Sequence, residues 1–162
     1  MSADCWAKIT VHACPSEYLD EVKGLLENEE FEGLPDGDEP ISLGETYARY
    51  ECYSDLAETI SDALGEISDD IAHAVTCGWG SDYSGFVIRY HPSLGKFEAT
   101  LDGDGQVVFT IEEIVEMRTL DDEAFDLASG RPWLAAFEAA SGDDPTTDAT
   151  SAAAVLTPEA VR

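Results

Sequence analysis

Basic residues are scarce in this 162-residue chain. Eight lysines and arginines stand against 35 aspartates and glutamates, which gives a formal charge of -27. Such a charge repels DNA, RNA and anionic membranes, attracts basic protein surfaces and cations, and weakens the fold by self-repulsion. The composition therefore argues against direct nucleic-acid or membrane binding and points to a basic protein as the partner.

Catalytic motifs are also lacking. The sequence has no GxSxG elbow, no phosphate-binding glycine loop and no HExxH helix. His12 and His73 fall in predicted strands and His91 stands beside Pro92, where histidines usually serve packing or the surface. Carboxylate pairs are numerous by chance, whereas a catalytic pair needs a water-excluding pocket that separates the two pKa values. We expect a non-enzymatic protein without catalytic residues or cofactors.

Close cysteine pairs are missing too. The four cysteines are far apart, and structural zinc sites usually contain a close pair such as CxxC. An alternative is a metal site in which one histidine and one cysteine share a strand face. The default prediction is four free, mostly buried thiols and no metal: Cys5, Cys14, Cys52 and Cys77.

One acidic segment has part of the calcium-loop pattern. Asp102, Asp104 and Glu113 occupy the first, third and twelfth positions of such a loop. The sixth position must turn sharply and is normally glycine, but here it is Val107, within a run typical of a strand. We therefore expect the DGDG sequence at 102–105 to form a hairpin turn.

Long apolar runs and targeting segments are absent from the sequence. The N-terminus has neither a basic start nor an apolar stretch, and no run approaches the roughly 18 apolar residues of a membrane span. Apolar residues nevertheless make up 44% of the chain and recur periodically, which is typical of a folded domain and not of an acidic disordered tail. We expect a soluble, cytoplasmic protein.

The first half of the chain has two strand-helix units. The alternation at 7–13 predicts a strand, and Pro15 then precedes a helix with Leu19, Val22 and Leu26 on one face. A proline- and glycine-rich loop follows at 33–44. Two further predicted elements complete this half, a strand at 45–53 and a helix at 55–67.

The second half has short strands and turns, then helices. Strands are predicted at 71–77, 86–91, 96–101 and 106–111, with a capped helix from Thr110 to Met117 and another from Pro132. Between the first two strands, an aromatic loop with Trp79 and Tyr83 folds back on the body or forms a contact surface; a small enzyme that uses this loop is a third hypothesis for function. The fold class is α+β: one domain at 1–142 with helices on one face of a mixed or antiparallel sheet, and a flexible tail at 143–162.

The helix at 55–67 has a row of carboxylates. At 100° per residue, the five acids fall within about 80° of one another, and the apolar face lies roughly 140° away. Solvated helices usually place a base four residues from an acid, since opposite charges stabilise and like charges destabilise by about 0.2 to 0.5 kcal/mol. This row has no base. Its members are Asp55, Glu58, Asp62, Glu66 and Asp69.

The spacing of the row suits a phosphate mimic. One helical turn rises about 5.4 Å, which is close to the spacing of roughly 6 to 7 Å between phosphates of one nucleic-acid strand. Acids are also concentrated nearby, because residues 17–70 hold 18 of the 35 in one third of the chain. A second acidic segment is expected to assist in partner binding: Glu27, Glu29, Glu30, Glu32, Asp36, Asp38 and Glu39.

In size and charge alone, the chain resembles the DNA-mimicking antirestriction and anti-CRISPR proteins of phages and plasmids. No family motif accompanies the resemblance, so it implies no residue roles. The first hypothesis is an inhibitor that occupies the basic nucleic-acid-binding groove of a nuclease, restriction enzyme or CRISPR effector. The alternative is a halophile-adapted or generally acidic domain, whose charge serves solubility and whose ligand or activity is unknown.

Overall fold

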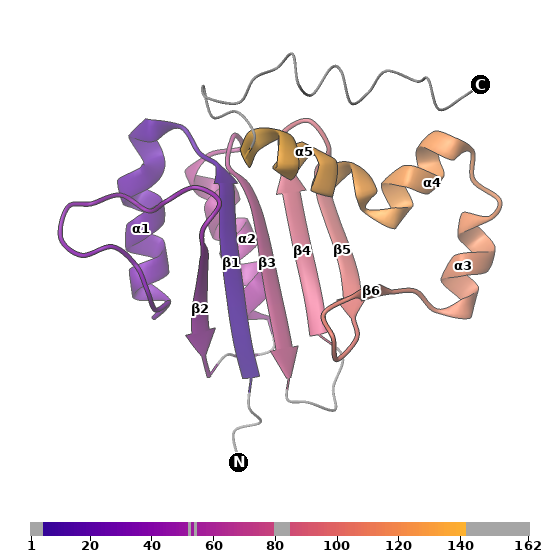
Figure 1. The fold of residues 1–162 in the computed structure, drawn as a ribbon, viewed down its shortest axis with the longest axis horizontal. Helices are drawn as coiled ribbons and strands as arrows, with labels where there is room; N and C mark the ends of the chain where they lie inside the picture. Colours follow the sequence, from indigo (N-terminus) through magenta and orange to yellow (C-terminus); the bar gives the residue numbers. More distant parts are fainter. Residues whose placement is uncertain (1–4, 52, 54, 80–84, 142–162) are drawn as a thin grey trace, which may run out of the picture.

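The computed structural model describes residues 5–51, 53, 55–79 and 85–141. The predicted tail, the position of Cys52 and the loop residue Tyr83 lie outside these ranges. Strands and helices both contribute to the fold, so the α+β prediction is confirmed (Figure 1). The helices are α1 (Leu19–Asn28), which follows a short 3₁₀ turn, α2 (Leu56–Ile67), α3 (Ile111–Met117), α4 (Asp122–Ser129) and α5 (Arg131–Ser141).

A single six-stranded sheet is the centre of the fold. Its order is β2-β1-β3-β4-β5-β6, and every pair is antiparallel. The last strand is shorter than predicted, because its pairing with β5 ends after two residues and the chain then turns into α3. The strands are β1 (Cys5–Ala13), β2 (Thr46–Tyr50), β3 (Ala72–Trp79), β4 (Gly85–His91), β5 (Gly95–Leu101) and β6 (Val107–Val108).

The larger core lies between one face of the sheet and the helices α1 and α2. Side chains alternate along a strand, so the register that aligns Ile9, Val75 and Ile88 points all three toward these helices. They are fully buried, as are Ile60 and Leu64 of α2. Burial of each such side chain stabilises the fold by about 1.5 to 3 kcal/mol. The apolar stripe predicted for this helix is therefore the side that docks.

Helix α5 packs against the opposite face of the sheet, which we call the open face (Figure 1). Trp133 and Phe137 of α5 are buried there with Phe97, and the Trp133 indole N–H donates to the carbonyl oxygen of Gly95 at 2.8 Å. The prediction that helices lie on one face is therefore wrong. The sequence pattern showed which side of each helix is apolar, but not on which side of the sheet the chain would return.

The turns and caps near α3 and α4 follow local chemistry. Thr110 and Glu113 form the predicted capping box. The backbone N–H of Asp102 donates to the carbonyl of Gln106 at 2.9 Å, which closes the predicted hairpin, and the Asp102 carboxylate accepts from two backbone N–H groups. That carboxylate stabilises the turn. Helix α4 was not predicted from the sequence. It ends at Gly130, whose φ is 76° and where a Cβ would overlap the Phe97 ring.

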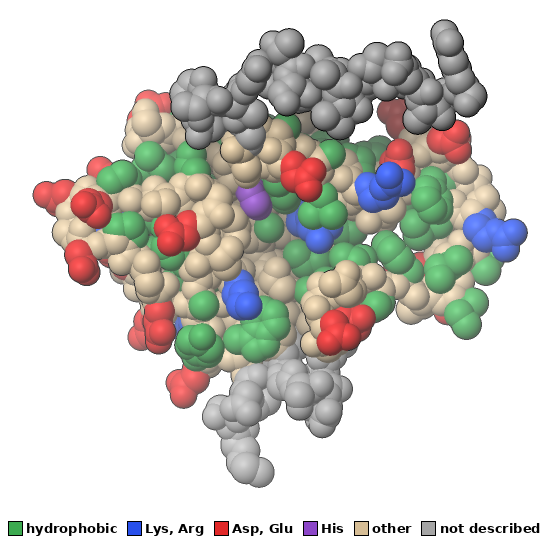
Figure 2. Space-filling model, in the orientation of Figure 1, with side chains coloured by type: hydrophobic (Ala, Val, Ile, Leu, Met, Phe, Trp, Pro, Cys, Tyr) green, Lys and Arg blue, Asp and Glu red, His purple; other side chains and the backbone are tan. Residues whose placement is uncertain are grey.

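The open face differs in charge from the rest of the molecule. Among the described strand residues that point to it, none is aspartate or glutamate, whereas Lys8 and Arg89 are basic. Figure 2 looks onto this face, and it shows basic side chains near apolar ones in the middle and acidic side chains mainly at the periphery. The carboxylates are thus not distributed evenly.

Candidate functional site

The predicted carboxylate row follows the solvent side of α2. Glu58, Asp62 and Glu66 are exposed on the helix, and Asp55 and Asp69 are exposed just before its first and after its last residue. The buried residues of α2 lie on the other side. Asp55 is at the N-cap position, but its side chain makes no cap hydrogen bond. The outward orientation agrees with the sequence analysis, and the role of the row in partner binding stays a prediction.

A base from another element approaches the row. Lys96 of β5 places its Nζ 3.6 Å from Asp62 Oδ1 and 3.3 Å from Glu98 Oε1. The helix itself contains no basic residue, as expected. The folded structure nevertheless places a lysine from a neighbouring strand beside the row. Sequence periodicity relates residues of one helix and contains no information about a strand side chain beside it. Because these groups are partly exposed, each pair contributes only about 0 to 1 kcal/mol.

The other exposed acids of the row have no such partner. Among the described residues, neither Glu58 nor Glu66 takes part in an ion pair. Glu66 also lines a groove between α1 and α2, with a volume of about 570 Å³, and Glu21 of α1 lines the same groove. The row is therefore continuous with acidic residues of α1. Glu21 was not singled out from the sequence, although its place in the first turn of a predicted helix suits an acid.

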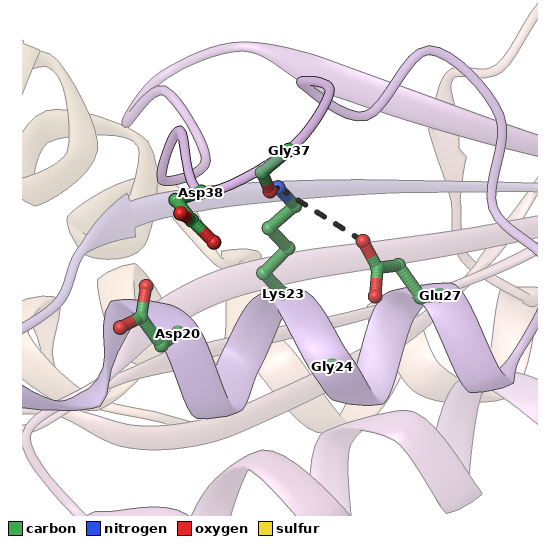
Figure 3. Close-up of a pocket in the computed structure, with 6 residues that line it drawn as sticks. All are labelled: Asp20, Lys23, Gly24, Glu27, Gly37 and Asp38. Atoms are coloured by element: carbon green, nitrogen blue, oxygen red, sulfur yellow. Dashed lines mark hydrogen bonds and ion pairs between the residues drawn. The ribbon is translucent and has the colours of Figure 1, made fainter.

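The second acidic segment is fastened to α1 by a buried lysine. Lys23 is only 6% exposed, and its Nζ donates to the carbonyl oxygens of Gly37 at 2.6 Å and Glu39 at 2.8 Å. Figure 3 shows the carboxylates of Asp20 and Glu27 on α1 and of Asp38 on the loop around it. The Lys23 Nζ is also 3.9 Å from Glu27 Oε1. One cation thus holds an acidic loop against an acidic helix beside a cavity of about 380 Å³.

The members of the second segment differ in how free they are. Glu29 is held internally: its Oε2 is 3.1 Å from Arg49 Nη1 and accepts from the Tyr53 hydroxyl at 3.3 Å. The expectation that it belongs to the partner-binding surface is thereby weakened. Glu32 is tied through its backbone to Ala48 of β2. All members except Glu29 are exposed: Glu27, Glu30, Glu32, Asp36, Asp38 and Glu39.

These groups define what we call the acidic face: the exposed carboxylates of α1, α2 and the loop between α1 and β2. Both helices pack on the same side of the sheet, opposite the open face. The acidic face therefore combines two segments that are distant in sequence. It is suited to electrostatic attraction of a basic surface.

A buried serine-histidine pair lies behind the row. Ser61 Oγ is 2.9 Å from His73 Nε2, and His73 Nδ1 is 3.0 Å from the carbonyl oxygen of Ile71. The carbonyl can only accept, so Nδ1 carries the proton and Nε2 accepts from the serine. Both side chains are buried, and burial lowers the pKa of His73 to about 4. This weak base and its shielded hydroxyl suit packing better than nucleophilic catalysis.

The pKa of His73 predicts a pH-dependent contribution to stability. The unfolded chain binds the imidazole proton near pH 6.5 and the folded chain only near pH 4. The contribution of neutral His73 is therefore complete above pH 6.5 and is lost as the pH falls toward 4. The loss amounts to about 3 kcal/mol. His73→Gln removes this titration.

Urea unfolding of both proteins at several pH values checks the prediction. The difference in free energy of unfolding between wild type and His73→Gln should shrink by about 3 kcal/mol between pH 7 and pH 4. Taking this difference removes the effect of the carboxylates, which are common to both proteins. A difference that stays constant over this range would show that His73 titrates normally in the fold.

The structure bears on two further features, the metal-ligating side chains and the state of the cysteines. Among the described residues, no group of three or more histidine, cysteine, aspartate or glutamate side chains is arranged to hold a metal ion. Cys14 and Cys77 are free thiols, whereas Cys5 is disulfide-bonded, so the prediction of free thiols is wrong at Cys5.

No helix in the described part of the chain is long and apolar enough to cross a membrane.

No protein-family model, curated protein or solved structure matches this chain. Its residues therefore take no roles from relatives. The acidic face is assigned from its own charge, exposure and position on the sheet.

Proposed function

We propose that the protein is a non-enzymatic inhibitor whose acidic face occupies the basic nucleic-acid-binding groove of a partner protein. The partner belongs to the nucleases, restriction enzymes or CRISPR effectors. One observation carries the proposal: exposed carboxylates that form no ion pair within the described part of the chain, Glu58 and Glu66 among them, follow a helix on the side of the sheet that also holds the acidic loop. Ion pairing within the described fold therefore does not account for Glu58 and Glu66.

Electrostatics gives the mechanism of this inhibition. A groove that neutralises phosphates with lysine and arginine attracts a dense carboxylate surface over distances up to the Debye length, about 8 Å at physiological salt. Complementary charge mainly raises the association rate and fixes the orientation of the complex.

A nuclease panel tests the proposal. The purified chain is added to restriction endonucleases and RNA-guided nucleases, and cleavage of a plasmid is followed over time. We expect inhibition of at least one enzyme that is relieved when the plasmid concentration is raised, because plasmid and inhibitor compete for one groove. Inhibition that a higher plasmid concentration does not relieve, or no inhibition across the panel, would contradict the proposal.

The second candidate is a domain adapted to high salt. In its favour, exposed carboxylates also occur on α3 and α4, away from the acidic face, at Glu112, Glu116 and Glu123. Salt screens the repulsion within such a surface and keeps an acidic protein folded and soluble. This candidate predicts loss of the fold in dilute buffer, whereas an inhibitor that works at ordinary salt must fold there.

A further inference from the structure

A cavity of about 480 Å³ lies between α5 and the open face, on the side of the molecule away from the acidic face. Its walls include Val87 of β4 and Leu134 and Phe137 of α5. Its volume is within the range of about 300 to 1,000 Å³ that is typical of small-molecule sites. Figure 2 shows this hollow beside α5, with a histidine and a basic side chain in it.

Arg89 is the unusual residue of this cavity. It is half-buried, and it makes no hydrogen bond or ion pair with any of the described residues. Its guanidinium carbon lies 5.5 Å from the centre of the Phe97 ring, a contact that leaves the N–H donors unused. Burial lowers the pKa of Arg89, because desolvation disfavours its charged form. In a chain with 35 acids, a half-buried arginine without a carboxylate partner in the described part of the chain needs an explanation.

His12 also lines this cavity, and one of its ring nitrogens is buried and unsatisfied. Its Nδ1 is buried and has no hydrogen-bond partner among the described residues. The ring stacks on Phe137 with a centroid distance of 4.0 Å and an interplanar angle of 9°. Burial lowers the pKa of this imidazole, so it is neutral at neutral pH and can donate one hydrogen bond. Buried polar groups in folded proteins normally have partners.

We infer that this cavity binds a small monocarboxylate with a flat apolar body, the carboxylate pairing with Arg89 and the body lying against Phe137 and Leu134. A guanidinium matches a carboxylate with two parallel hydrogen bonds. Glu138 also lines the cavity, and its charge disfavours a ligand with a second negative charge. Because Glu138 stands near Arg89 in this cavity, the site suits a ligand with one negative charge better than a phosphate dianion.

Binding of 1-naphthoate to the full chain, measured by titration calorimetry, tests the inference. Two probes share its rings: 1-naphthamide lacks the charge, and 1-naphthyl phosphate carries more charge. We expect naphthoate to bind more tightly than either. Arg89→Gln should weaken naphthoate binding by about tenfold or more, as expected for loss of a charged hydrogen-bonded pair. Lys8→Gln removes a cation from the same face outside the cavity, so it should change binding little.

Arg89→Lys keeps the charge but loses the paired geometry, and it should bind naphthoate with intermediate affinity. This variant keeps the test decisive if Arg89→Gln folds poorly, which its melting curve would reveal. Equal binding of naphthoate and naphthamide, or unchanged binding in both variants, would show that the apolar body alone binds and would overturn the inference. Tighter binding of naphthyl phosphate, or no naphthoate binding at millimolar concentration, would overturn it as well.

Discussion

Reversal of two charges on α2, in the double variant Glu58→Lys with Glu66→Lys, is expected to weaken inhibition of the target nuclease by about a hundredfold. Like charges brought together across an interface cost several kcal/mol, and about 1.4 kcal/mol corresponds to a factor of ten. Neither glutamate forms an ion pair among the described residues. The new lysines would stand four residues from Asp62 on either side, so the helix itself should gain slightly in stability.

The matched control reverses Asp104 and Glu116, which are exposed near the β6 edge of the sheet. It changes the net charge by the same amount, so diffuse attraction falls equally in both variants. Inhibition constants from the plasmid-cleavage assay provide the comparison, and melting curves verify that both variants fold. An equal loss of inhibition in the two variants would contradict a specific acidic face.

Lys23→Met is expected to lower the free energy of unfolding by about 3 to 6 kcal/mol. The change keeps most of the buried stem and removes two hydrogen bonds from a charged donor, each of which contributes about 1.5 to 3 kcal/mol. The loop around Gly37 and Glu39 then loses its attachment to α1. Urea unfolding at constant pH and salt gives the measurement.

Lys8→Met is the control for this stability change. Lys8 is exposed, and its Nζ lies over the Trp6 ring at 5.0 Å without an ion pair among the described residues. The control removes the same charge and should cost less than about 1 kcal/mol. If both variants lose the same stability, net charge and not the attachment of the loop determines the effect of Lys23.

Local patterns predicted most of the elements of this fold. The carboxylate row of α2 is visible in the sequence because hydrophobic periodicity separates it from Ile60 and Leu64. The hairpin at 102–105 and the cap at Thr110 follow from side chains that bond to backbone a few residues away. Each of these features depends only on neighbours in the chain, and so it could be predicted.

Features that require contacts between distant residues could not be predicted. The pairing of Lys96 with Asp62 depends on β5 reaching the side of α2, 34 positions away in the sequence. The retention of Glu29 by Arg49 depends on the place of β2 beside β1. The cavity around Arg89 exists only because α5 returns to the face opposite α2. Periodicity and local motifs in one sequence carry no information about such contacts between distant residues.

Thermal unfolding in dilute buffer and in molar KCl tests most directly whether the acidity serves a partner or serves salt adaptation. Screening in molar salt acts over about 3 Å and removes most repulsion between surface carboxylates. If the charge serves a partner, the chain should unfold cooperatively in dilute buffer, with a melting temperature that molar KCl raises only modestly. A chain that is unfolded in dilute buffer and folds only on addition of molar KCl would contradict this account. The negative charge would then be an adaptation to high salt.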